Sequence, residues 1–189
     1  MTQISFTSRI KFIPLYEFDN LIDSKKFTFV RMNGRPIQGE NVGTKALATC
    51  IGGGIYNNRG VMVFHYSDEC KYNKHYFLEG INKLKSADKL RGIIVGGYKE
   101  ISITTFNFFK NLFDELKIKP TIIYGQQNST NFEITDIAYS TKEDTWFLNS
   151  SNVLYRKNKI NSPLDLPDYF SFIHIADGDQ LFINDKKLL

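Results

Sequence analysis

The spacing of apolar side chains along the chain predicts alternating strands and helices. Two apolar runs, Ile51 to Tyr56 and Val61 to Phe64, flank an Asn-Asn-Arg-Gly turn and predict a β-hairpin, because Asn and Gly favour tight turns. Apolar residues at three- or four-residue spacing predict helices near 73–85 and 104–117. Short apolar runs predict further strands at 9–13, 27–31, 92–97, 120–124, 132–139, 145–148, 153–156, 170–175 and 180–183.

These elements predict an α/β sandwich of two mixed β-sheets with helices on the outside. The segment between the first two strands contains Pro14 and polar residues and is interpreted as a connection. The turn signal Asn33-Gly34-Arg35-Pro36 leads on through Gly39 and Gly43. The 189 residues, 42% of them hydrophobic, suffice for one sizeable core, so we expect a single domain over residues 1–189.

The termini and the cysteines favour a protein made in the cytoplasm. The chain begins without the layout of a secretory signal and has no run of about 18 apolar residues, so we expect no membrane insertion. Translocation into a host cell by a needle-type apparatus stays open, because such export signals have no physical signature. Two cysteines, Cys50 and Cys70, do not make a disulfide framework, although a single bridge between them also stays open.

Charge and histidine content argue against nucleic-acid and metal sites. The net charge is +4, and the lysines are scattered rather than gathered beside aromatic platforms, so we expect no nucleic-acid partner. The pairs Lys25-Lys26 and Lys186-Lys187 are interpreted as solvated ends. Histidines at 65, 75 and 174 lack the spacing of metal ligands, and no cofactor is implied.

The hairpin register places a thiol near an imidazole. If Tyr56 faces Val61 across the turn, Gly52 lies opposite His65, and Cys50 is its diagonal neighbour on the same face. Diagonal partners are roughly 7–8 Å apart at Cα, within side-chain reach. A slip of one residue would send His65 to the other face.

These residue types suit nucleophilic catalysis. An adjacent imidazole lowers the pKa of a thiol, so we expect Cys50 to be a low-pKa nucleophile and His65 its base. Thr44, six residues before Cys50, is a hydroxyl that can hold the imidazole in one tautomer. Gly52 to Gly54 leave space for a substrate to approach. Backbone N–H groups of Thr49, Ile51 and Gly52 are candidates for an oxyanion site, at about 3–4 kcal/mol per donor.

The same residues have a structural interpretation. Cysteine is among the most buried residue types, and a cysteine at the start of an apolar strand is often a small core residue. A single histidine after a run such as Val-Met-Val-Phe is commonly a hydrogen-bonded polar group at a strand end. The chemistry of the residues alone leaves both interpretations open.

The segment around Cys50 resembles the catalytic region of the CheD-like protein glutamine deamidases. In that superfamily a Thr stands six positions before the nucleophilic Cys, a Leu-Gly-Ser or Leu-Ser-Gly run precedes it, and a His follows on the next strand. This chain has Thr44, a Leu-Ala-Thr-Cys run at 47–50, and His65. Ala48-Thr49 replaces the small pair, and Tyr66 to Asp68 stands where CheD proteins often carry Leu-Pro. These departures favour a bacterial toxin or effector over a chemotaxis protein.

The resemblance implies both a fold and an activity. It implies an α/β sandwich in which Cys50 attacks a glutamine carboxamide of a target protein, His65 moves the proton and Thr44 holds the ring. Ammonia leaves, water hydrolyses the thioester, and no cofactor takes part. Two alternatives stay open, namely a catalytically silent binding module of the same fold and a thiol hydrolase acting on esters or peptide bonds.

Other polar residues are weaker candidates. His75 is expected on a solvated helix face and His174 in a packed or edge position of a late strand. Asp177 and Asp179 suit a turn better than paired acid–base chemistry. The run Gln126-Gln127-Asn128 is a polar loop that nothing in the sequence places near the cysteine.

Overall fold

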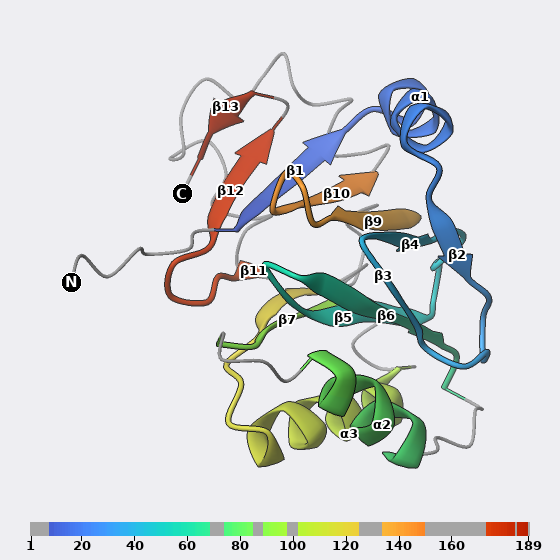
Figure 1. The fold of residues 1–189 in the computed structure, drawn as a ribbon, viewed down its shortest axis with the longest axis vertical. Coiled ribbons are helices and arrows are strands. Elements are labelled where there is room, and N and C mark those ends of the chain that lie inside the picture. The colour runs from blue at the N-terminus through green and yellow to red at the C-terminus, as the bar shows by residue number, and fades with distance from the viewer. Residues whose placement is uncertain are drawn as a thin grey trace.

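Two mixed β-sheets pack face to face, and helices lie against their outer faces (Figure 1). The computed structural model describes residues 8–68, 74–84, 89–97, 102–124, 134–149, 173–183 and 185–188. Parallel and antiparallel pairings occur in both sheets. The predicted α/β sandwich of two mixed sheets with flanking helices is therefore confirmed.

The seven-stranded sheet contains strands from both the N-terminal and the C-terminal part of the chain. Its order is β13-β12-β1-β10-β9-β4-β2, so strands from the beginning and the end of the sequence are neighbours. Its strands in chain order are β1 (Arg9–Ile13), β2 (Thr28–Val30), β4 (Asn41–Thr44), β9 (Asp136–Ser140), β10 (Thr145–Asn149), β12 (Gln180–Ile183) and β13 (Lys186–Lys187).

The six-stranded sheet contains the predicted hairpin at its centre. Its order is β11-β8-β7-β5-β6-β3. Its strands in chain order are β3 (Ile37–Gly39), β5 (Ile51–Asn57), β6 (Gly60–Tyr66), β7 (Arg91–Gly96), β8 (Thr121–Tyr124) and β11 (Ile173–His174). Every residue of β5 and β6 is buried, which fits strands covered on both faces.

The three helices of the described residues cover the outer faces. Helices α2 (Lys74–Leu84) and α3 (Ile103–Glu115) lie beneath the six-stranded sheet in Figure 1 and bury Phe77, Phe109 and Phe113 against it. Helix α1 (Leu15–Lys25) packs Phe18 and Ile22 on the seven-stranded sheet. None of the helices in the described part of the chain is long and apolar enough to cross a membrane.

The largest apolar core lies between the sheets. Side chains from both inner faces meet there, and each large one that is fully buried contributes about 1.5–3 kcal/mol to folding. Tyr56, Tyr139 and Trp146 form an aromatic group at its centre, with ring centroids 4.8 to 5.5 Å apart. This core fixes the spacing between the sheets, and therefore between side chains that reach across from one sheet to the other.

Several predicted elements need correction. The Pro14 segment is not a simple connection: Pro14 precedes α1, whose apolar side is narrow because only Phe18 and Ile22 are buried. Short strands β3 and β4 also occupy the stretch interpreted as a turn and connection. Lys186 and Lys187 are exposed as expected but pair with β12 as β13. The strand predicted at 153–156 lies outside the described residues.

Candidate functional site

The hairpin has the predicted register. Tyr56 lies opposite Val61 and Gly52 lies opposite His65, as the turn residues predicted. The turn itself closes differently: the Asn57 side chain accepts a hydrogen bond from the N–H of Arg59 at 2.9 Å, and no residue of the turn has a positive φ. An Asn side chain that mimics a backbone turn therefore replaces the expected left-handed conformation.

His65 reaches across the sandwich to Thr44. His65 lies on β6 of one sheet and Thr44 on β4 of the other, and their Nδ1 and Oγ1 atoms are 2.7 Å apart. The two residues are 2% and 0% exposed. The structure thus brings together the predicted base and its predicted orienting hydroxyl.

A second hydrogen bond fixes the tautomer of His65. The Thr44 hydroxyl donates to the backbone carbonyl of Val30 at 3.0 Å. Because a hydroxyl has one hydrogen, Thr44 then accepts from His65, and Nδ1 carries the ring proton. The lone pair of the neutral ring is left on Nε2, which is the atom that a general base needs.

The Nε2 atom of His65 is buried and has no hydrogen-bond partner among the described residues. Burial disfavours the charged ring and lowers the pKa of His65 to about 4. The imidazole is therefore neutral near pH 7. A buried polar atom without a partner is uncommon in folded proteins, and such atoms occur at functional sites.

Cys50 stands directly before β5, two residues before Gly52. Alternate residues of a strand face the same side, which places Cys50 on the face of Gly52 and His65. Cys50 is a free thiol and 6% exposed. Its Sγ donates to Sδ of Met32 at 3.6 Å, and no hydrogen bond joins it to His65.

The predicted low-pKa thiol is not present in this state. Burial raises the pKa of Cys50, while a hydrogen bond with the Thr49 side chain acts in the opposite direction. A neutral imidazole that is not hydrogen-bonded to the sulfur provides no positive charge to stabilise a thiolate. The resting site therefore contains a neutral thiol and a neutral imidazole rather than an ion pair.

The turn that carries Cys50 has strained backbone. Ala46 and Ala48 adopt φ values of 57° and 40°, which cost a non-glycine residue about 1–2 kcal/mol. Between them Leu47 is fully buried in the inter-sheet core, and its carbonyl accepts from the N–H of Cys50 at 2.5 Å. Leu47 thus anchors a tight turn that presents Cys50, and strain of this kind clusters at functional sites.

The start of α3 also supports this turn. Ser102 precedes the helix, but its hydroxyl donates to the carbonyl of Thr49 at 2.6 Å instead of capping the helix. Asp68 takes over part of the cap and accepts from the N–H of Thr105 at 3.0 Å. Ser102 therefore joins the start of α3 to the cysteine turn, and Asp68 holds the start of the helix in place.

The three candidate oxyanion donors lie in different surroundings. Ile51 and Gly52 stand in register with neighbours on both sides, so their main chains belong to the centre of the sheet. Thr49 lies in the exposed turn. The N–H of Cys50 itself is bonded to Leu47. The geometry thus leaves Thr49 as the candidate nearest to solvent.

The glycines of β5 do not provide room for a substrate. A Cβ at Gly52 would lie 2.5 Å from Cδ2 of Leu47, and one at Gly54 would lie 2.7 Å from the Trp146 ring. A Cβ at Gly53 would lie 2.1 Å from the carbonyl oxygen of Ile93. Protein atoms already fill these spaces, which corrects the prediction of substrate approach along Gly52 to Gly54.

Two residues near the thiol carried no clear signal in the sequence. Met32 covers the Cys50 sulfur although it is 56% exposed. Asn33 belongs to the recognised turn, and its N–H donates to the carbonyl of His65 at 2.8 Å. The Asn33-Gly34 pair predicted a turn, but only the fold shows that this turn borders the thiol.

The other candidates lie away from this group. His75 is exposed on α2, and His174 is exposed on the edge strand β11. Asp177 is exposed, whereas Asp179 is buried and accepts from the hydroxyls of Ser8 and Thr121, each at 2.5 Å. Within the described residues, no His, Cys, Asp and Glu side chains group in a way that could hold a metal ion. Cys70 and the run Gln126-Gln127-Asn128 lie outside the described residues.

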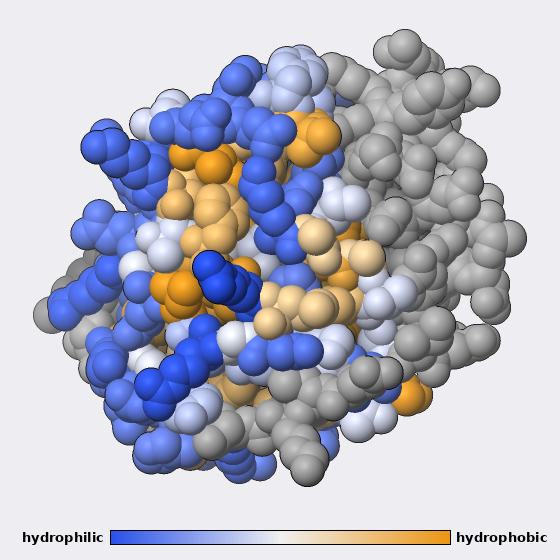
Figure 2. Space-filling model, turned by 90° about the vertical axis from the view of Figure 1, so that its right-hand side faces the viewer, coloured by the Kyte–Doolittle hydropathy of each residue, from blue (hydrophilic) through white to orange (hydrophobic). Residues whose placement is uncertain are grey.

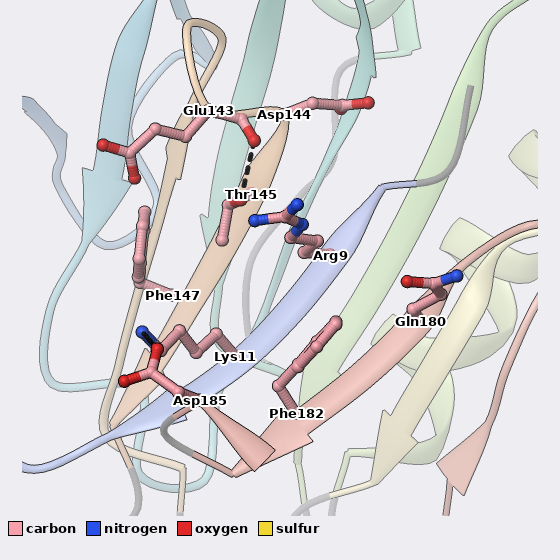
Figure 3. Close-up of a pocket in the computed structure, with 9 residues that line it drawn as sticks. All are labelled: Arg9, Lys11, Glu143, Asp144, Thr145, Phe147, Gln180, Phe182 and Asp185. Carbon is pink, nitrogen blue, oxygen red and sulfur yellow. Dashed lines mark hydrogen bonds and ion pairs between the residues drawn. The ribbon is translucent and has the colours of Figure 1, made fainter. Parts of the chain in front are cut away.

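A pocket of about 570 Å³ lies on the outer face of the seven-stranded sheet (Figure 3). Lys11 and Asp185 form an ion pair of 2.7 Å within it, and the Arg9 guanidinium lies 6.0 Å from the centroid of the Phe182 ring. Strands β1, β10 and β12 supply most of the lining. None of the lining residues belongs to the group around Cys50.

No protein-family model matches this chain, and no curated protein is significantly similar to it in sequence. Its chemistry therefore has to be inferred from its own residues. Within the described residues, the arrangement of Thr44, His65 and Cys50 is the one that best suits a specific chemical reaction.

Proposed function

We propose that the chain is a cysteine-dependent protein glutamine deamidase, similar to the CheD-like superfamily. The observation that supports this most directly is the Thr44–His65 hydrogen bond, which leaves the lone pair of His65 on Nε2. The strained turn and the unpartnered Nε2 atom support the same proposal. A purely structural histidine would ordinarily have both ring nitrogens bonded.

The proposed reaction has two steps. His65 takes the thiol proton of Cys50 at Nε2 as the sulfur attacks the carboxamide carbon of a glutamine side chain. The same proton then passes to the departing nitrogen, the C–N bond breaks, and ammonia leaves a thioester. Water activated by His65 hydrolyses the thioester to glutamate and returns the thiol. Thr44 holds the ring so that Nε2 stays directed at the reaction.

The proposed partner is a protein with a reactive glutamine. As a deamidase, the chain would act in the cytoplasm of its own cell or, as a toxin or effector, in a host cell. The thiol of Cys50 is hydrogen-bonded to Met32 and not to His65, so substrate binding has to rearrange the thiol before attack. Catalytic hydrogen bonds are often formed only in the substrate complex.

The decisive experiment is a search for deamidated protein. Purified wild-type chain is incubated with host and bacterial lysates, and peptides are examined for glutamine-to-glutamate conversion together with ammonia release. The conversion should be absent with Cys50→Ala and strongly reduced with His65→Ala. Cleaved peptide bonds or released alcohols in place of ammonia would indicate the other thiol hydrolase.

The burial of the site favours one further candidate, a silent binding module. Thr44, His65 and Cys50 are all nearly inaccessible, as in a structural core. A partner retained equally by wild type and Cys50→Ala, with no change in the partner's mass, would support this candidate over the deamidase.

A further inference from the structure

Met32 occupies the solvent side of the thiol. Its Sδ atom is 3.6 Å from Sγ of Cys50, and its side chain is 56% exposed while Cys50 is 6% exposed. His65 and Thr44 behind the thiol are more buried still. A substrate carboxamide that reaches Cys50 from the solvent side must therefore replace the Met32 side chain.

The backbone of the Met32 turn is held firmly. The Asn33 N–H donates to the carbonyl of His65, and the Asn33 side chain accepts from the N–H of Ser67 at 2.9 Å and donates to its hydroxyl at 2.9 Å. The N–H of Gly34 also donates to the carbonyl of Arg31 at 3.0 Å. The turn is thus attached to the end of β6, which carries the base.

The Met32 side chain is the part of this turn that can move. Methionine is unbranched, has several rotatable bonds and adapts to different apolar partners. Rotation of its side chain would uncover the sulfur while Asn33 stays bonded to His65. Opening the site therefore requires a change of side-chain conformation rather than a movement of the loop.

We propose that Met32 is a substrate-contacting cover of the Cys50 thiol, an inference that rests on the proposed deamidase function. The target glutamine displaces the thioether, and Met32 then packs on the aliphatic part of the glutamine and on an apolar residue beside it. Displacement also ends the contact between the two sulfur atoms. The thiol is then released to turn toward Nε2 of His65, so substrate entry and activation of the nucleophile are one event.

The surface around this turn suits a local contact. On the side of the molecule on which β2 and α1 lie in Figure 1, hydrophilic and apolar areas alternate over the coloured part of the surface (Figure 2). An exposed methionine directly over the thiol therefore supplies apolar contact at the position where the glutamine side chain enters.

The first test measures access to the thiol by iodoacetamide. Alkylation of Cys50 at pH 8 is followed by peptide mass spectrometry in wild type, Met32→Ala, Met32→Leu and Leu78→Ala, an exposed apolar control on α2. We expect Met32→Ala to react about tenfold faster, as for a cover that costs about 1.4 kcal/mol to open. Met32→Leu and the control should react like wild type.

Two outcomes would contradict the proposed role of Met32 as a cover of the thiol. An unchanged alkylation rate in Met32→Ala would show that Met32 does not limit access. Equal acceleration in Met32→Leu and Met32→Ala would show that the sulfur–sulfur contact, and not the volume of the side chain, protects the thiol. Because Met32 is exposed, these variants are expected to fold, and circular dichroism verifies it.

The second test measures substrate preference. Ammonia release is compared for the peptides acetyl-Leu-Gln-Gly-amide and acetyl-Asp-Gln-Gly-amide, and Met32→Ala should reduce the preference of kcat/KM for the first. If alkylation responds to Met32 but no peptide or protein is deamidated, the cover holds and the proposed function fails. If wild type deamidates both peptides with a preference that Met32→Ala leaves intact, the function holds and the proposed role of Met32 fails.

Discussion

The hydroxyl of Thr44 on one sheet lies 2.7 Å from Nδ1 of His65 on the other, and it donates its own hydrogen to the carbonyl of Val30. This chain of hydrogen bonds crosses the interior of the sandwich. The packing of the two sheets therefore determines which nitrogen of the His65 ring carries the proton. Changes at Thr44 should therefore affect both stability and chemistry.

Removing the Thr44 hydroxyl should destabilise the fold. In Thr44→Val, the carbonyl of Val30 and Nδ1 of His65 both lose a buried partner, and we expect the free energy of unfolding to fall by about 1–3 kcal/mol. Urea denaturation measures the change. Thr44→Ser is the matched control because it keeps the hydroxyl, and a loss as large as that of the valine variant would show that the methyl group matters more than the hydrogen bonds.

The same variant tests whether Thr44 acts through His65. Once a deamidated target is found, Thr44→Val should lower turnover and His65→Ala should lower it more, because the second change removes the base. The double variant should be hardly worse than His65→Ala alone, since residues that act as a unit give non-additive losses. Turnover is measured as ammonia release at equal folded fraction. If the loss in the double variant equals the product of the two single losses, Thr44 has a role independent of the ring.

His65 should make stability depend on pH. The pKa of the ring is about 4 in the folded protein and about 6.5 when unfolded, so the unfolded chain binds more protons between these values. Stability is then greatest above about pH 6.5 and falls as the pH drops toward 4, by about 3 kcal/mol. Urea denaturation at pH 4.5 and pH 7 measures this difference. In His65→Gln the difference should be smaller, and an identical pH dependence in both proteins would refute the neutral buried ring.

The free thiol should titrate independently of His65. Burial raises the pKa of Cys50, and the imidazole is neutral and makes no hydrogen bond to the sulfur. We expect the Cys50 thiolate, followed by absorbance in the substrate-free protein with Cys70→Ser, to appear only above the usual thiol range, at the same pH with and without His65→Ala. A thiolate that forms at lower pH in wild type than in His65→Ala would demonstrate an ion pair in the resting state.

Relieving the strained turn should stabilise the protein. Ala48 has a φ of 40°, so Ala48→Gly removes a steric penalty and should raise the free energy of unfolding by about 0.5–1 kcal/mol after the entropy cost of glycine. Thermal and urea unfolding measure the gain. Ala176→Gly is the control, because Ala176 is not among the positive-φ residues and should lose stability. Lower stability in both variants would show that the Ala48 conformation is not strained.

Local sequence patterns determined the hairpin and most of the regular elements. Alternation and turn residues are short-range properties, so they predicted β5, β6, α2 and α3 close to their observed bounds. The turn residues also predicted the register, in which His65 lies opposite Gly52, because a hairpin register depends only on local sequence. Helix α1 was missed because its apolar side has only two buried residues, Phe18 and Ile22.

Only the tertiary structure decided the state of the thiol. The sequence separation of 18 residues between Met32 and Cys50 has no periodicity that predicts contact, and the two meet because β2 and β5 belong to facing sheets. The sequence likewise predicted space for a substrate beside the glycines of β5, whereas Leu47 and Trp146 fill that space. Burial in the packed sandwich keeps His65 neutral, and the hydrogen bond with Thr44 sets its tautomer. The sequence supplied the reactive groups, and long-range packing determined their protonation and their accessibility.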